Sequence, residues 1–309
     1  MSKSDFDLSN YPNLIAIPYA KTLDAKGDIN EITKEWDPDD PQRKDYQRIC
    51  LEMILSFNAS VCLANYYYYK TVEAGDDSKS KKDAKIGAEL SNLDFDLGMM
   101  SIGKWNQVAR DTARALFDAT GGGNNNEFLI KQIGSLYQNK EWNTPVDQLI
   151  AKRNKDAHGD VISDTVGLAK ELDKRQKMLD QLMTQMSFLA DYKLIVPIDD
   201  DVPAGILVHI CKDLSGFGDT VISLNGAEID RYNTYLYNKK TKKTTCLPLD
   251  PMVINYNTSP ETEEIDTYIY SKTANNKKDL HYSNFHGSID LKDKSQSSVG
   301  SLSTPNELC

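Results

Sequence analysis

Residues 145–159 read PVDQLIAKRNKDAHG, and the rest of the chain is interpreted outward from this stretch. Pro145 suits the first turn of a helix, because the N–H that it lacks would be unpaired there. Gly159 suits the left-handed conformation that commonly ends a helix. We therefore predict a helix from Val146 to His158. At about 100° per residue, its apolar residues form one buried stripe, which consists of Val146, Leu149, Ile150 and Ala157.

The polar end of this predicted helix carries three side chains suited to phosphodiester chemistry. Asn154 and His158 are four residues apart and share a face, and the long side chain of Arg153 can reach the same opening. An imidazole can transfer a proton near neutral pH, and a guanidinium can stabilise charge on phosphate oxygens. The alternative is structural, with Arg153 paired to a nearby carboxylate and His158 capping the end of the helix.

This pattern of Arg153 and Asn154, three further residues, and His158 followed by Gly159 resembles the motif of the HEPN superfamily (higher eukaryotes and prokaryotes nucleotide-binding). Ribonuclease members of that superfamily carry Arg, a polar residue, a short spacer and His. Two flanking stretches look like those of bacterial multidomain HEPN proteins, SIGKW at residues 101–105 and FLADY at residues 188–192. The likeness covers residues 40–195, about half of the chain.

The resemblance implies a metal-independent endoribonuclease of bacterial defence or toxin systems, which needs no cofactor. It also implies a homodimer in which two motif helices form one composite RNA cleft. In that cleft His158 would move the proton of the ribose 2′-hydroxyl or of the leaving oxygen, Arg153 would stabilise the phosphorane, and Asn154 would orient either group. Lys152 and Lys155 flank these residues and are the candidate RNA-binding side chains. Cleavage would leave a cyclic phosphate, and DNA would not react.

A second hypothesis fits the same residues. The helical domain would be a catalytically silent HEPN relative that dimerises, and the β region would recognise a partner protein or trigger. The motif lacks an obvious second catalytic carboxylate, and the sequence does not select between Glu52 and Asn58 as a further polar group on the preceding long helix. The net charge of −10 also favours this hypothesis, because it opposes broad binding to nucleic acid and requires any RNA contact to be local.

The cysteines and the apolar runs limit the class of protein. The five cysteines are scattered and lack CxxC spacing, which indicates neither a disulfide framework nor a zinc site: Cys50, Cys62, Cys211, Cys246 and Cys309. No signal segment opens the chain, and no apolar run is long enough to span a membrane. We therefore expect a cytoplasmic protein with no membrane partner.

Helical periodicity dominates the first two thirds of the chain. Residues 1–40 are acidic and rich in turn-forming residues, and we predict an N-terminal arm with a short helix around residues 14–23. The strongest pattern predicts a long amphipathic helix from Tyr46 to Ala64. Further helices are predicted over residues 83–93, 102–117, 127–137 and 164–189, and the Gly-rich residues 121–126 are a connection, since no phosphate-loop Lys follows them. Residues 41–195 are thus predicted to form a helical bundle.

After Asp191 the apolar pattern changes to an alternating one with β-branched residues. Short strands are predicted over residues 193–198, 205–211, 220–224, 234–237, 252–256 and 267–270, with a hairpin turn at residues 238–243. Strands at this spacing suggest a small antiparallel sandwich or barrel. The predicted fold is therefore α+β: an all-α HEPN-like bundle, a small antiparallel β domain over residues 196–289, and a disordered tail over residues 290–309.

Overall fold

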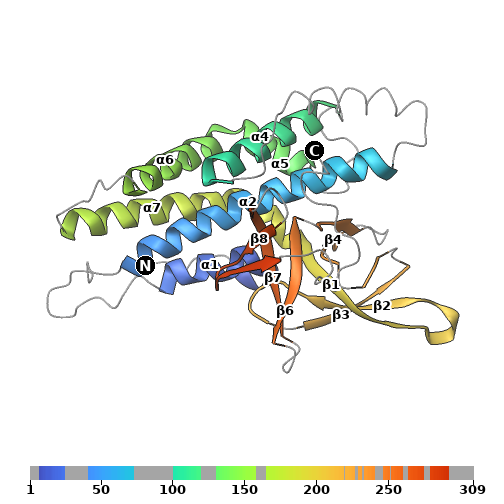
Figure 1. The fold of residues 1–309 in the computed structure, drawn as a ribbon. Coiled ribbons are helices and arrows are strands. Elements are labelled where there is room, and N and C mark those ends of the chain that lie inside the picture. The colour runs from blue at the N-terminus through green and yellow to red at the C-terminus, as the bar shows by residue number, and fades with distance from the viewer. Residues whose placement is uncertain are drawn as a thin grey trace.

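The computed structural model describes residues 7–24, 41–72, 100–119, 130–157, 165–218, 220–226, 229–231, 233–240, 246–250, 252–259, 264–274 and 279–291. Helices occupy the N-terminal part and strands the C-terminal part, which confirms the α+β class (Figure 1). The predicted helix at residues 83–93, the Gly-rich connection, His158 and residues 292–309 lie outside the described residues.

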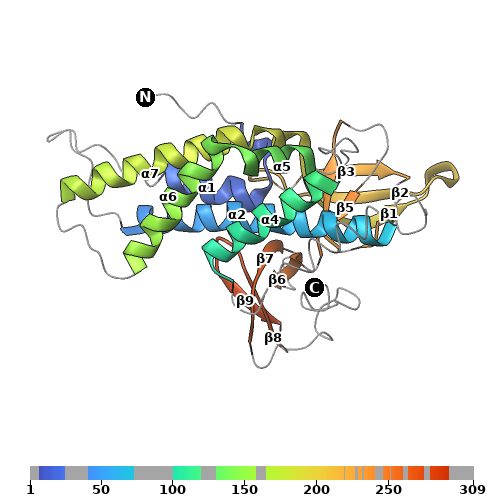
Figure 2. The ribbon, with the colours of Figure 1, turned by 90° about the horizontal axis from the view of Figure 1, so that it is seen from above.

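The described helices are α1 (Asn13–Asp24), α2 (Pro41–Val72), α4 (Ile102–Ala119), α5 (Ile130–Gln138), α6 (Lys140–Ala157) and α7 (Thr165–Gln185). Helix α2 runs through the middle of the molecule: in Figure 1, α4, α6 and α7 lie above it, whereas α1 and the strands lie below it. Figure 2 shows from above that α2 runs along the length of the molecule. The predicted helices after Pro41 are present wherever the structure describes them. The helix ending near residue 189 stops earlier, at Gln185, and a short 3₁₀ turn over Ser187–Asp191 leads into the first strand.

The middle of α2 differs from the predicted amphipathic helix, because it is buried on every face. From Leu51 to Asn65, every residue except Glu52 is buried. Three polar side chains in this stretch bond to the carbonyl oxygen four residues earlier, over distances of 2.8–2.9 Å: Ser56, Ser60 and Asn65. The helix thus satisfies these polar groups internally, which permits polar residues inside the core.

The strands form two antiparallel sheets. The first contains β1 (Tyr192–Asp201), β2 (Val208–Asp213), β3 (Thr220–Asn225), β4 (Tyr235–Asn238) and β5 (Cys246–Pro248), in the order β3-β2-β1-β4-β5. The second contains β6 (Val253–Ser259), β7 (Glu264–Ala274), β8 (Asp279–Ser283) and β9 (Ser288–Leu291), in sequence order. All six predicted strands are present, and β4 pairs with β5 as the predicted hairpin. β8 and β9 were not predicted, and β9 includes Asp290 and Leu291, which the sequence assigned to the tail.

Residues 7–24 contain the predicted short helix, as α1, and they are part of the core. Ile15 and Tyr19 of α1 are fully buried against the main hydrophobic cluster. Backbone bonds tie this segment to the turn after β2, from Asn13 N–H to Leu214 O (2.9 Å) and from Gly216 N–H to Tyr11 O (2.8 Å). Gly216 has a φ of +65°, and a Cβ there would lie 2.7 Å from the Cα of Ser9, so this close approach requires glycine.

One hydrophobic core joins the helices to the strands. It includes buried residues of all six described helices and of both sheets. Trp105 of α4 meets Tyr270 of β7 edge to face, with ring centroids 6.5 Å apart, and Tyr270 meets Tyr282 of β8 in the same way at 5.8 Å. The predicted boundary near residue 195 therefore separates types of secondary structure, and the two sides share a core. Whether residues 41–195 and 196–289 unfold separately stays a prediction.

Candidate functional site at the end of helix α6

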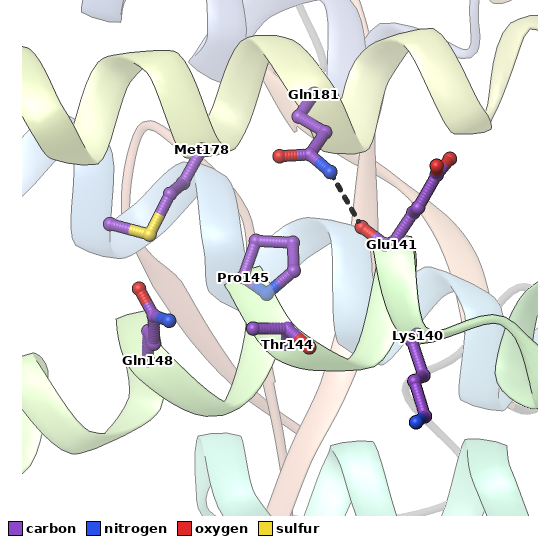
Figure 3. A pocket seen from close by; sticks show the side chains of 7 residues that line it. All are labelled: Lys140, Glu141, Thr144, Pro145, Gln148, Met178 and Gln181. Carbon is purple, nitrogen blue, oxygen red and sulfur yellow. Dashed lines mark hydrogen bonds between the residues drawn. The ribbon is translucent and has the colours of Figure 1, made fainter.

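Helix α6 begins at Lys140, which is earlier than the predicted start at Val146. The side chain of Asn139 caps it, since Asn139 Oδ1 accepts a hydrogen bond from the N–H of Glu141 (2.9 Å). Pro145 therefore lies inside the helix and cannot donate to the carbonyl oxygen of Glu141. Gln181 of α7 donates its side-chain Nε2 to that oxygen instead (2.9 Å, Figure 3). A neighbouring helix thus replaces the hydrogen bond that the proline removes.

A shallow pocket of about 340 Å³ lies over this part of α6, between α6 and α7. Figure 3 shows the seven residues that line it: Lys140, Glu141, Thr144, Pro145, Gln148, Met178 and Gln181. None of the predicted catalytic or RNA-binding residues is among them. The pocket and the predicted site are therefore different places on the same helix.

The apolar face of α6 matches its predicted stripe except at its end. Val146 and Leu149 are buried, Ile150 is half-buried, and Ala157 is exposed because the helix has left the core by then. Trp142 precedes the predicted start of the helix and is fully buried. The first half of α6 is therefore anchored by packing, and its last turns lie at the surface.

Charged residues hold the last turns of α6 against α2 and α7. Lys152 forms an ion pair with Glu171 of α7. Asp156 accepts two hydrogen bonds from Arg175 of α7 (2.6 and 3.2 Å) and pairs with Lys44 of α2 (3.1 Å). We call these five residues the ion-pair cluster. Lys152, the first of the two predicted RNA-binding lysines, is thus committed to a contact within the protein.

The ion-pair cluster keeps its carboxylates ionised. Burial opposes ionisation of Asp156, but the hydrogen bonds and charges of Arg175 and Lys44 outweigh it and lower the pKa of this carboxyl. Glu171 behaves alike, because its contacts with Lys152 and Arg175 outweigh burial and lower its pKa. Arg175 is almost fully buried and bonds to both carboxylates, so it is the centre of the cluster.

Arg153 differs from its neighbours because the ion-pair cluster does not engage it. Its side chain is half-buried, and its guanidinium donates a hydrogen bond to Asn154 Oδ1 at 3.4 Å. Within the described residues, no carboxylate lies within ion-pair distance of this guanidinium. Asn154 and Lys155 are exposed. The structure thus places three of the predicted site residues together at the surface: Arg153, Asn154 and Lys155.

The structure distinguishes Glu52 from Asn58, the two polar residues of α2 that the sequence left open. Burial raises the pKa of Glu52, and the positive charges of Arg48 and Arg153 oppose that rise, so Glu52 lies close enough to Arg153 for the two charges to interact. Arg48 Nη1 lies 3.4 Å from Glu52 Oε2. Asn58 is fully buried elsewhere, with its Nδ2 3.7 Å from the sulfur of Met186. Glu52 is therefore the carboxylate that belongs to the candidate site, which consists of Glu52, Arg153, Asn154 and Lys155.

The remaining residue of the predicted site is His158. His158 follows directly after the last described residue of α6 and lies outside the described residues. Among the residues that the structure does describe, no three His, Cys, Asp or Glu side chains are grouped as metal ligands. In the same residues, no helix has the length and apolar character needed to cross a membrane.

Comparison of the chain with known protein families, with curated proteins and with solved structures finds no match.

Proposed function

We propose that this chain is a cytoplasmic, metal-independent endoribonuclease of the HEPN type, acting in bacterial defence or as a toxin. The observation that supports it is the state of Arg153. Its neighbours Lys152 and Asp156 are held in ion pairs within the protein, whereas the Arg153 guanidinium lies at the surface beside exposed Asn154. An arginine without a paired carboxylate retains donors for two phosphate oxygens.

The proposed reaction divides the chemistry among few groups. His158 takes the proton of the ribose 2′-hydroxyl or gives one to the leaving oxygen, and Arg153 stabilises the charge of the phosphorane. Asn154 orients the phosphate or His158, and exposed Lys155 attracts the RNA backbone. The 2′-oxygen attacks the phosphorus and the 5′-oxygen leaves, so the products carry a cyclic phosphate and a 5′-hydroxyl. A second copy of the chain completes the cleft in this proposal.

Glu52 is a further residue of the proposed site. The Glu52 carboxylate offsets part of the positive charge of Arg153 before RNA binds. The same contact favours the second hypothesis, in which Arg153 serves as a structural partner of Glu52 and the helical part only dimerises and binds. Replacing Glu52 therefore distinguishes the two functions. In the nuclease it changes the rate of RNA cleavage, whereas in the binding module it changes only the stability of the fold.

The experiment is cleavage of labelled RNA and matched DNA by the purified chain in the presence of EDTA. We expect RNA but not DNA to be cut, and Arg153→Ala and His158→Ala to lower the rate by about two to four orders of magnitude. Arg114→Ala is the matched control, because Arg114 is an exposed arginine on a different helix. Glu52→Gln should change the rate while RNA is still cut.

Several outcomes would reject the nuclease. Activity that survives both Arg153→Ala and His158→Ala, or that disappears with EDTA, would exclude this mechanism. A folded wild type that cuts no RNA would leave the binding module as the better function. The product ends give a further check, since a 3′-hydroxyl in place of a cyclic phosphate requires a different nucleophile.

A further inference from the structure

Asp250 carries an enclosed carboxylate in the connection between the two sheets. β5 ends at Pro248 and β6 begins at Val253, so the residues between them lead the chain from the first sheet to the second. Asp250 Oδ2 accepts a hydrogen bond from the N–H of Thr234, which directly precedes β4 of the first sheet. The other oxygen, Oδ1, is shielded from solvent, and within the described residues it has no hydrogen-bond partner.

This carboxylate lacks the positive charge that accompanies other enclosed carboxylates of the chain. Asp213 pairs with Lys193, and Asp156 pairs with Arg175 and Lys44. For Asp250, no cation of the described residues is among the groups that shift its pKa. An ionised carboxylate that leaves water without a partner is costly, so its neutral acid is favoured. Burial accordingly raises the pKa of Asp250 to about 7, although the hydrogen bonds from Thr234 and from its own N–H act to lower it.

Two tyrosines are the ionisable groups that interact with Asp250 in the described part of the chain: Tyr235 of β4 and Tyr282 of β8. Burial raises the pKa of both tyrosines, and the charge of Asp250 adds to that rise. Both are therefore neutral near pH 7 and cannot offset a negative charge. Helix α2 contacts β5, and the one charged residue of its buried stretch Leu51–Asn65 is Glu52, which belongs to the candidate site.

Hydrogen bonds continue from Thr234 into the second sheet. Asn255 of β6 donates its Nδ2 to Thr234 Oγ1 (2.6 Å), and Thr267 of β7 donates its hydroxyl to Asn255 Oδ1 (3.2 Å). These three side chains are buried. The N–H of Leu249 also donates to the carbonyl oxygen of Thr234 (2.8 Å). Thr234 is thus the residue through which the two sheets are bonded, and Asp250 accepts its N–H.

We propose that Asp250 makes the junction of the two sheets sensitive to pH. In the protonated form, the neutral carboxyl keeps its hydrogen bond to Thr234 and the junction stays closed. When the proton passes to solvent, an uncompensated negative charge remains between the sheets. The chain relieves this charge by opening at the connection between β5 and β6, which admits water to Asp250. The junction is therefore closed at mildly acidic pH and weakened above neutral pH.

The test is urea denaturation of the full chain at several pH values, for the wild type and for Asp250→Asn. The variant keeps an oxygen for the N–H of Thr234 but cannot ionise. Because the folded pKa of Asp250 lies above the unfolded value near 4, the folded chain binds the extra proton between these values, and stability falls as the pH rises. The ratio of the wild-type unfolding constant to that of the variant should rise about tenfold from pH 5 to pH 6 and level off above about pH 7. This ratio removes the effect of the histidines, which titrate in the same range.

Hydrogen exchange distinguishes opening of the junction from unfolding of the whole chain. At about pH 8 the amides of Thr234 and Leu249 should exchange faster in the wild type than in Asp250→Asn, whereas the amides of β1 should exchange alike. Asp266→Asn is the matched control, because Asp266 is a partly exposed residue beside Thr267 on β7. This control should keep the pH dependence of the wild type.

Parallel pH profiles of the wild type and Asp250→Asn, or equal exchange of the junction amides in both, would overturn the proposal. If Asp250→Asn does not fold, infrared spectra of a chain that retains Asp250 decide. Glu52→Gln is the background for them, because burial also raises the pKa of Glu52. A protonated carboxyl band at about pH 5 that is lost by about pH 8 is expected, and its absence at about pH 5 would overturn the proposal. The proposal does not depend on RNA cleavage, since Asp250 is not part of the candidate site.

Discussion

The two halves of α6 are fixed by different forces. In the first half, Trp142 and Val146 are fully buried in the core, so packing sets the position of the helix. In the second half, Lys152 and Asp156 are held by ion pairs to α7 and α2. A packed half tolerates little change, whereas the charged half leaves Arg153 partly exposed and Asn154 and Lys155 exposed to solvent. The helix therefore combines a packed base with a polar, solvent-exposed end.

The packed half should give the largest loss of stability. Trp142→Ala should lower the free energy of unfolding by about 3–5 kcal/mol, because it leaves a large cavity in the core. Urea denaturation measures the change. Asn154→Ala, at an exposed position of the same helix, is the control and should change stability by less than about 0.5 kcal/mol. Comparable losses of folding stability in Trp142→Ala and Asn154→Ala would show that the two halves of α6 stabilise the fold equally.

Next in size is the effect of removing charge from the ion-pair cluster. Asp156→Asn should destabilise the chain by about 1–3 kcal/mol, because it deprives almost fully buried Arg175 of a charged partner. Asp147→Asn, an exposed position on α6, should have little effect. Thermal unfolding of both variants gives the comparison. Equal melting temperatures would mean that water replaces the ion pairs without loss.

The same cluster predicts a pH dependence of stability. The pKa values of Asp156 and Glu171 are lowered in the folded protein. Their contribution is therefore present above the unfolded values near 4 and is lost as the pH falls through the folded values. Between about pH 5 and pH 2, the wild type should lose stability more steeply than Asp156→Asn. Parallel profiles from urea titrations at several pH values would contradict this assignment.

A smaller effect is expected at the contact that lets Pro145 remain inside α6. Gln181→Ala should cost about 0.5–1.5 kcal/mol, the net contribution of one hydrogen bond, since Gln181 is exposed and water can reach the carbonyl of Glu141. Gln148→Ala is the matched control, because Gln148 lines the same pocket. A loss of the same size in both variants would show that the pocket wall, and not the hydrogen bond, is responsible.

The start of α6 shows where sequence reasoning is limited. Pro145 is most often found in the first helical turn, and that preference misplaced the start of the helix. The compensating donor, Gln181, is forty residues away from Glu141, so no local pattern reveals it. The capping residue Asn139, two residues before Glu141, was a local signal that could have corrected the start. Long-range compensation decides whether a proline ends a helix or stays within it.

Periodicity predicted the elements well, but it could not show what covers them. The spacing of apolar residues identified α2 and the strands, yet the burial of α2 on every face results from α1 and α4 together with strands that follow more than a hundred residues later. The candidate site shows the same limit. The residue types at 152–155 were visible in the sequence, whereas the pairing of Lys152 with Glu171 and the choice of Glu52 over Asn58 depend on how three helices pack.

The smallest expected change in stability is at Arg153, and it distinguishes the two proposed functions. Arg153→Ala should change the free energy of unfolding by less than about 0.5 kcal/mol, because within the described residues its guanidinium makes one long hydrogen bond, to exposed Asn154. A structural partner of Glu52 would behave otherwise: its removal would leave a carboxylate whose pKa burial already raises, and Glu52→Gln would then restore the lost stability. Urea denaturation of the two single variants and of the double variant measures this coupling. If Arg153→Ala keeps a stability near that of the wild type but loses RNA cleavage, Arg153 takes part in the reaction. If Arg153→Ala loses stability and the added Glu52→Gln restores it, Arg153 has a structural role.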